Sequence, residues 1–288
     1  MNNFILHFFK AKTRQFDYEK LLSFFDEIPE TEVEEATEDS TELRILYRNP
    51  VLKSEANFVI SRKSTVREIH KLDPQYLDVN FRLEVPLRTP NFNAKFIFKI
   101  ARDLAEEFEF AVFNSLFEDV LNFRMEVVER VFELTKEHYK EKHGYKFENV
   151  YFYPEEELND CLKYVNEQYD LQRYYKEQNV YVPNYYIVVD ESKKVYFAIE
   201  WEENKRTVFP PHIKYIYYHT GFQTVILPYD EVMAKIEKFT TNVPGFIQNT
   251  KVIAKKQHNR VSKAIRRTKF SQVEKTLIRI DLSQIIDF

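Results

Sequence analysis

The stretch KVYFAIEWEENKRTVFPPHIKYIYY, residues 194–218, decides the fold of this chain. Apolar and polar residues alternate up to Trp201, the chain turns at 202–205 and crosses Pro210 and Pro211, and an aromatic run follows. Alternation with a period of two predicts strands with one buried face, because successive side chains point to opposite sides. The segment therefore predicts the core of a β-sheet, with Trp201 as an anchor of its buried face.

Strands and helices are predicted along all 288 residues. Alternation and apolar runs predict strands at 1–12, 43–48, 56–63, 79–87, 110–113, 184–189, 194–201, 213–218, 224–227 and 278–282. Helical spacing predicts helices at 17–28, 90–110, 118–143, from 154 onwards and at 230–239, the first capped by Asp17. We expect an α+β fold of two packed units with antiparallel sheets flanked by helices. The predicted boundaries are 1–117 for the N-terminal unit, 118–150 for a linking helix and 151–288 for the C-terminal unit with its basic tail.

The composition excludes several classes of site. Only three glycines occur, at 144, 221 and 245, and loops that bind phosphate through backbone amides need glycines, so neither a Walker loop nor a GxGxxG turn is present. The single Cys161 cannot form an internal disulfide and lacks the neighbouring Cys and His of a zinc site. We therefore expect no cofactor and a reducing compartment.

No part of the sequence predicts a membrane segment. The apolar run near the N-terminus is too short to span a bilayer and is followed by no small-residue cleavage site. No other stretch approaches the roughly 20 apolar residues of a spanning helix. We expect a soluble, cytoplasmic protein.

Charge is concentrated in two segments of opposite sign. Nine acidic and no basic residues occur in 26–42, and ten basic residues with one acid occur in 251–279, while the whole chain carries −4. The acidic segment is either a solvated loop or a docking patch, whose candidate residues are Glu30, Glu32, Glu34, Glu35, Glu38 and Asp39. The basic tail, predicted to lie as a helix on the body, offers Lys255, Lys256, Arg260, Lys263, Arg266 and Arg267.

The basic tail has three candidate partners. Its cations could neutralise nucleic-acid phosphates, bind an acidic protein, or pair with the protein's own acidic surface. Because the tail contributes +9, the remainder of the chain sums to −13. Repulsion from such a remainder opposes nucleic acid, so self-neutralisation or an acidic protein partner competes with it.

The strongest enzyme-like pattern is a set of three carboxylates. Asp190 ends one predicted strand, and Glu200 and Glu202 share a face of the next, so hard oxygen ligands could bind a divalent metal as nucleases do. The lysine that would activate water is missing, however, and acids alternating with apolar residues are ordinary on a half-exposed strand. The seven histidines form no metal-binding pair, and no nucleophile with a base can be identified. We therefore predict no catalytic residues and no metal site, with a metal-dependent nuclease as the enzymatic alternative.

Two places resemble an uncharacterised bacterial α+β family often encoded beside type VI secretion or toxin and immunity loci. The first is LYRNPVLKSEANFVI, 46–60, with LDVNFRLEVPLRTPNF, 77–92; the second is YFAIEWEENKRTVFPPHIKYIYY, 196–218, with Trp201, Pro210 and Tyr215. The chain departs from the family pattern where Lys53 and Ser54 replace an expected glycine, and in its basic tail. The resemblance implies a shared fold and an accessory role inside the bacterial cell, and it assigns no catalytic residues.

These observations together favour a non-enzymatic, intracellular protein-binding protein. The resemblance implies an immunity or adaptor protein whose partner is a toxin or a secretion component. The alternative is a nucleic-acid-binding protein or a metal-dependent nuclease.

Overall fold

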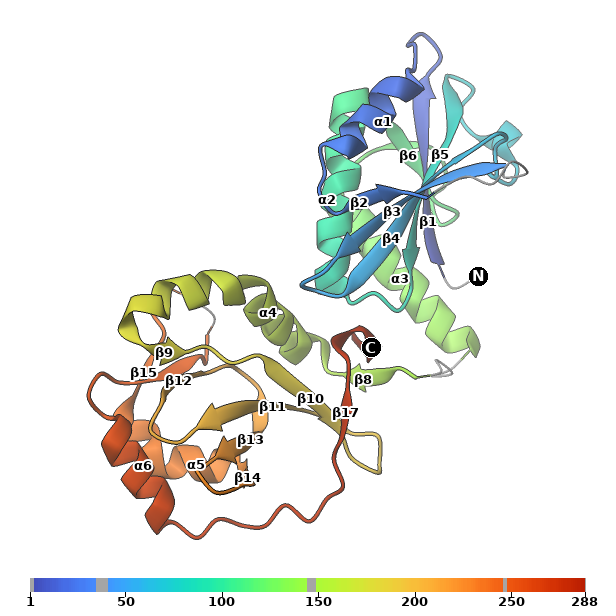
Figure 1. The fold of residues 1–288 in the computed structure, drawn as a ribbon. Helices are drawn as coiled ribbons and strands as arrows, with labels where there is room; N and C mark the ends of the chain where they lie inside the picture. Colours follow the sequence, from blue (N-terminus) through green and yellow to red (C-terminus); the bar gives the residue numbers. More distant parts are fainter. Residues whose placement is uncertain (1–2, 35–40, 144–148, 246–247, 288) are drawn as a thin grey trace. The chain divides into compact units, whose positions relative to one another are not determined.

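The computed structural model describes residues 3–34, 41–143, 149–245 and 248–287. The chain divides into two compact units, Met1–Glu148 and Asn149–Phe288 (Figure 1). Each unit combines helices with sheets made mainly of antiparallel strands, which confirms the predicted α+β class. In the described ranges, no helix is both long enough and apolar enough to cross a membrane.

The first unit is built on a seven-stranded antiparallel sheet in the order β2-β3-β4-β5-β1-β6-β7. Its strands are β1 (Asn3–Ala11), β2 (Thr31–Val33), β3 (Glu42–Asn49), β4 (Ser54–Ser61), β5 (Tyr76–Pro86), β6 (Ala111–Phe113) and β7 (Leu121–Asn122). Alternation along β5 places Phe81, Leu83 and Val85 in the apolar core. Arg82 and Glu84 therefore lie on the opposite face of the sheet.

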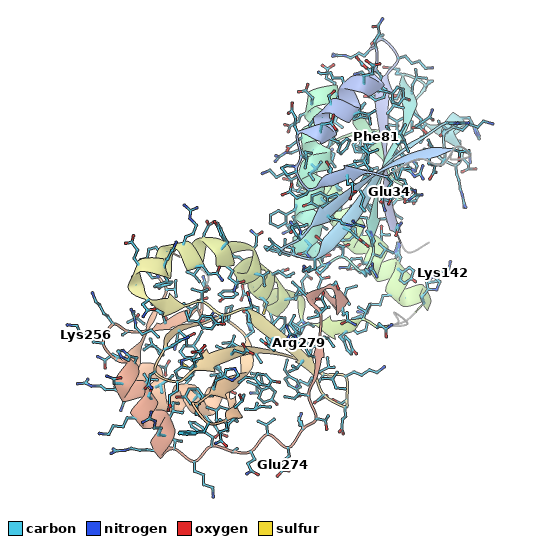
Figure 2. All side chains as sticks on the ribbon, in the orientation of Figure 1. Glu34, Phe81, Lys142, Lys256, Glu274 and Arg279 are labelled. Carbon is cyan, nitrogen blue, oxygen red and sulfur yellow. The ribbon has the colours of Figure 1, made fainter. Side chains whose placement is uncertain are left out.

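Three helices pack on the apolar face of this sheet (Figure 1). They are α1 (Tyr18–Asp26), α2 (Asn91–Phe108) and α3 (Met125–His143). Phe4 of β1 meets Phe98 of α2 and Phe132 of α3, with ring centroids 5.7 and 5.5 Å apart. Edge-to-face packing of this kind adds to the stabilisation from buried area, and Figure 2 marks Phe81 in the same core.

Helix α3 falls within the segment that we expected to link the two units. Its Val128 and Phe132 are buried in the first core, and the division of the chain places the helix in the first unit. It begins at Met125, later than the predicted 118, because residues 121–122 form β7 and pair with β6.

Asp17 caps helix α1 as predicted. Its carboxylate accepts hydrogen bonds from the backbone N–H groups of Glu19 and Lys20 at 2.9 and 3.3 Å. Because these donors have no partner inside the helix, Asp17→Ala is expected to lower the free energy of unfolding by about 1 kcal/mol. Chemical denaturation measures the change. Asp17→Ser, which keeps a capping oxygen, should recover most of it, and equal losses for both variants would contradict a capping role.

The second unit contains three sheets. Their strand orders are β14-β13-β11-β10-β17, β15-β16-β12-β9 and β18-β8. The strands are β8 (Tyr151–Tyr153), β9 (Val180–Tyr181), β10 (Tyr185–Val189), β11 (Val195–Glu202), β12 (Arg206–Phe209), β13 (Ile213–His219), β14 (Thr224–Pro228), β15 (Thr240–Asn242), β16 (Lys251–Ile253), β17 (Ile278–Ile280) and β18 (Ile285–Asp287). The helices are α4 (Glu155–Tyr175), α5 (Tyr229–Ile236) and α6 (His258–Arg267).

The stretch 194–218 forms three strands in two of these sheets. Strand β11 pairs in parallel with β13, while β12, which lies between them in sequence, pairs with β16 and β9 in the four-stranded sheet. The excursion through β12 reverses the chain twice, so β13 returns in the direction of β11. As predicted, Trp201 is buried: its ring meets Phe209 and Tyr218 at 5.4 and 4.9 Å, and its Nε1–H donates to the Lys205 carbonyl.

Candidate interaction surfaces

The acidic segment is only partly a loop. Residues Glu35, Glu38 and Asp39 lie outside the described ranges. Thr31–Val33 instead forms β2, an edge strand paired with β3, so Glu32 lies on a sheet edge. Its carboxylate is 3.8 Å from the Arg48 guanidinium, and both side chains are exposed. Charged side chains on an edge strand keep it from pairing with other chains, which gives Glu32 a role that needs no partner.

Helix α6, which contains most of the predicted basic residues of the tail, packs against helix α5 through its apolar side. Val261 and Ile265 are buried in the same apolar cluster as Val232 and Ile236 of α5. The Ser262 hydroxyl is also buried and accepts a hydrogen bond from the Asn204 N–H. This packing fixes the rotation of α6, and therefore which side chains it exposes.

The exposed side of α6 is basic. Arg260, Lys263 and Arg267 follow one another at spacings of three and four residues, which places them on one face of a helix. Their face lies opposite Val261 and Ile265, which are buried. We call this surface the α6 basic face and define it by four exposed residues: Lys256, in the turn before the helix, with Arg260, Lys263 and Arg267. Figure 2 marks Lys256 at the surface of the second unit.

Other cations of the tail are already used inside the second unit. Arg266 Nε donates to Glu203 at 2.7 Å and holds the pKa of that carboxyl below its usual range. Lys251 pairs with Glu237, and Lys275 with Asp190. Arg266, which belongs to the predicted binding set, therefore already has an ion-pair partner within the unit.

The α6 basic face, by contrast, is not neutralised by the described part of the chain. Among the described residues, none of its four members forms an ion pair. Arg260 donates a hydrogen bond to the Gln257 side-chain amide oxygen at 3.4 Å. Lys255, beside it, is likewise exposed and without an ion pair among the described residues. The first unit carries 28 acids against 22 Lys and Arg, while the second has 18 against 20, giving −6 and +2. Because the tail at 251–279 contributes +9, the rest of the second unit sums to −7, so the −13 of the remainder is divided about equally between the two units.

The three carboxylates considered for a metal site are not brought together. Asp190 lies at the turn, opposite Lys194, whereas Glu200 lies six residues further along the chain, which separates their backbones by roughly 20 Å at 3.3 Å per residue. Glu202 pairs with Lys205, and Glu200 lies 3.7 Å from His219. In the ranges that the structure describes, no group of three or more His, Cys, Asp or Glu side chains could hold a metal ion.

Asp190 instead anchors the segment before β17. Its Oδ2 accepts hydrogen bonds from the Tyr196 hydroxyl and from Lys275 Nζ, both at 2.9 Å. Its Oδ1 accepts from the backbone and hydroxyl of Ser192. These donors, with Ser192 first, hold the pKa of Asp190 well below its usual range. No local pattern predicts this cluster, because Asp190 and Lys275 are 85 residues apart.

Sequence reasoning also missed a charge cluster on the first unit. Arg82 donates to Glu84 and to Glu42, each at 2.7 Å, and Arg44 donates to Glu42 at 2.8 Å. All four lie on the face of the sheet opposite the helices. One sequence signal could have indicated the cluster. Glu42 and Arg44, and likewise Arg82 and Glu84, are two residues apart, so each pair of opposite charges projects from the same face of its strand.

Comparisons with family models, with curated proteins and with solved structures find no match.

Proposed function

We propose that this chain is a protein-binding protein that holds an acidic surface of its partner on the α6 basic face. The observation that carries the proposal is the contrast within the tail. Arg266, Lys251 and Lys275 each have an acid of their own, whereas the four aligned cations have none among the described residues. Exposed charges arranged on one rigid face accelerate association with a complementary surface and select against others.

The size of this face favours a protein over nucleic acid. Helix α6 has ten residues and is about 15 Å long, which suits a compact acidic patch. Residues 149–250 of the same unit carry 15 acids against ten Lys and Arg. An extended polyanion would run beyond the helix onto this more acidic surface, whereas a short acidic segment would not.

The role that follows is recognition without catalysis. Binding through one face would occlude the partner's surface or escort the partner, as an immunity or adaptor protein does. A toxin or a secretion component is the partner that the resemblance of 46–60, 77–92 and 196–218 implies, and the cytoplasm is the compartment that we propose for the encounter.

Affinity capture of the tagged full chain from its native cytoplasm, with nuclease present, tests the proposal. Mass spectrometry should identify a protein partner, and the purified partner should then bind the chain directly. The quadruple variant Lys256→Glu, Arg260→Glu, Lys263→Glu, Arg267→Glu should weaken that binding at least roughly 30-fold, because each exposed pair contributes about 0.5–1 kcal/mol. Isothermal calorimetry of partner with variant measures the change.

The matched control reverses four other exposed lysines of the second unit: Lys163, Lys176, Lys193 and Lys235. Its net charge changes by the same amount, so it should bind nearly as the wild type does. Equal weakening by both variants would reduce the effect to overall charge and contradict a defined face. Capture that disappears with nuclease, with a steep salt dependence of DNA or RNA binding, would replace the protein partner with nucleic acid.

A further inference from the structure

One apolar side chain of the second unit is completely exposed. Phe222 has an exposed fraction of 100%, against 69% for Tyr169, the next most exposed large apolar side chain among the described residues. Phe222 lies with Gly221 at the tip of the hairpin between β13 and β14. Isolated exposed apolar residues are ordinary on protein surfaces, but hairpin turns favour Gly, Asn and Asp for their backbone conformation. The turn itself therefore gives no reason for a phenylalanine at its tip.

The hairpin tip is held by its own hydrogen bonds. The backbone N–H and the hydroxyl of Thr220 both donate to the Gln223 carbonyl at 2.9 Å, and the hydroxyl oxygen accepts from the Gln223 N–H at 3.1 Å. Behind the tip, His219 Nδ1 and the Thr224 hydroxyl lie 2.7 Å apart and join the two strands. Phe222 is therefore presented at a fixed place, and a contact that is ordered before binding loses less entropy when a partner binds.

The base of this hairpin and helix α6 contact the same turn, the one that follows β11. The Glu203 N–H donates to the His219 carbonyl at 2.9 Å, three residues before Phe222. The Glu203 carboxylate accepts from Arg266 Nε of α6 at 2.7 Å, and the N–H of the next residue, Asn204, also donates to α6. The hairpin that carries Phe222 therefore neighbours the helix that carries the α6 basic face, and both belong to the second unit.

The hairpin tip and the α6 basic face supply different kinds of contact. Residues 220–224 carry no charge, whereas the α6 basic face has four cations without an ion pair among the described residues. Protein interfaces combine an apolar centre, in which a few aromatic side chains contribute most of the affinity, with charged groups that direct association. The two features together have this composition.

We propose that Phe222 is the apolar anchor of the binding surface. Its ring enters an apolar pocket of the partner protein, and acidic side chains on the rim of that pocket bind the α6 basic face. This inference rests on the proposed function and adds the apolar part of the partner's surface to it.

A bilayer also accepts exposed apolar side chains, but surfaces that bind membranes insert several of them in one plane. Among the described residues of this hairpin and of α6, Phe222 is the one large apolar side chain that is exposed. A single ring suits a pocket in a protein better than a lipid surface.

A photo-crosslinker at the hairpin tip tests the inference. The full chain with Phe222→p-benzoylphenylalanine is irradiated in its native cytoplasm with nuclease present. The label should crosslink one protein, at a peptide where apolar residues lie beside Asp and Glu. Adding the four α6 charge reversals to the labelled chain should lower the yield about tenfold or more. The same label at Tyr169, which is exposed on α4, is the matched control and should give little product.

Isothermal calorimetry with the crosslinked protein, once it is identified and purified, measures the contribution of the ring. Phe222→Ala should weaken binding roughly 10–100-fold. The salt dependence of binding should stay unchanged, because the variant removes apolar contact and no charge. Phe222→Leu keeps most of the apolar area and should lose about fivefold or less. Urea unfolding followed by Trp201 fluorescence checks that each variant keeps the fold of the second unit.

The outcomes separate this inference from the proposed function. Binding that the four α6 reversals weaken and Phe222→Ala leaves unchanged would overturn the anchor and keep the basic face. Binding that neither change affects would overturn both. No crosslink from position 222, or an equal yield from position 169, would also overturn the anchor. Sedimentation with vesicles of equal parts phosphatidylcholine and phosphatidylserine, if Phe222→Ala reduced it, would replace the protein pocket with a membrane.

Discussion

Replacing Arg82 with methionine is expected to lower the free energy of unfolding of the first unit by about 3–5 kcal/mol. The guanidinium is buried and binds Glu42 and Glu84 at 2.7 Å each. Removing it leaves Glu42 and Glu84 with Arg44 as the one cation that they share, at a site where Glu84 is also buried. One buried negative charge is then uncompensated, which is strongly destabilising. Urea denaturation followed by circular dichroism measures the loss.

The pH dependence of this effect has a defined sign. Hydrogen bonding to Arg82 lowers the pKa of Glu42 below its ordinary value of 4.5. A lowered carboxyl pKa contributes stability that is present above the ordinary value and is lost as the pH falls through the folded-state value. The difference in the free energy of unfolding between wild type and Arg82→Met should therefore have its full size at pH 7 and become smaller below about pH 4.5.

Arg88→Met is the matched control for this prediction. Arg88 pairs with Glu55 at 3.1 Å, but both side chains are about half exposed, and exposed pairs contribute under about 1 kcal/mol. The double variant Arg82→Met, Glu84→Gln should recover part of the loss, because it removes one carboxylate and leaves Glu42 paired with Arg44. Equal losses for Arg82→Met and Arg88→Met would contradict the account of a buried network.

The sequence specified those parts of the fold that depend on local pattern. The cap at Asp17, the alternation that buries Trp201, and the helical stripe from Asn91 to Phe108 were all readable, because each is set by residues within a few positions of one another. The apolar stripe of α6 at Val261 and Ile265 belongs to the same class. These local signals were sufficient to predict the class of fold and the exposed cations of α6.

Short strands were missed because their pairing is not local. The four residues of β12 carry little alternation, and their partners β9 and β16 lie on either side of them in the sequence. The parallel pairing of β11 with β13 follows from that excursion, which no pattern within 194–218 specifies. For β2, the acidic composition masked a strand of three residues.

Ion pairs between residues far apart in the sequence could not be predicted for the same reason. Arg82 and Glu42 are 40 residues apart and meet across the intervening strand β4, where Val59 pairs with both β3 and β5. Without the strand register, Glu42, Arg44 and Arg82 are ordinary surface charges. The register turns them into a cluster, and it also removes Arg266 from the set of free cations by placing Glu203 beside it.

Replacing Trp201 with alanine is expected to lower the free energy of unfolding of the second unit by about 3–5 kcal/mol. The indole is fully buried against Phe209 and Tyr218. Its removal leaves a cavity in the core that also contains Ile216. It also leaves the Lys205 carbonyl without the hydrogen bond that the indole N–H donates to it at 2.9 Å. Hydrogen exchange of the full chain in increasing urea, resolved by peptide, assigns the loss to a unit.

Trp201→Phe separates the two contributions. It keeps an aromatic ring and loses the hydrogen bond and part of the volume, so its loss should be well below that of Trp201→Ala. Because Trp201 is the only tryptophan of the chain, its fluorescence reports on the second unit. In Arg82→Met that fluorescence transition should stay at the wild-type urea concentration while the first-unit peptides exchange earlier. A fluorescence transition that moved with Arg82→Met, or a Trp201→Ala loss confined to first-unit peptides, would contradict two units with cores of their own.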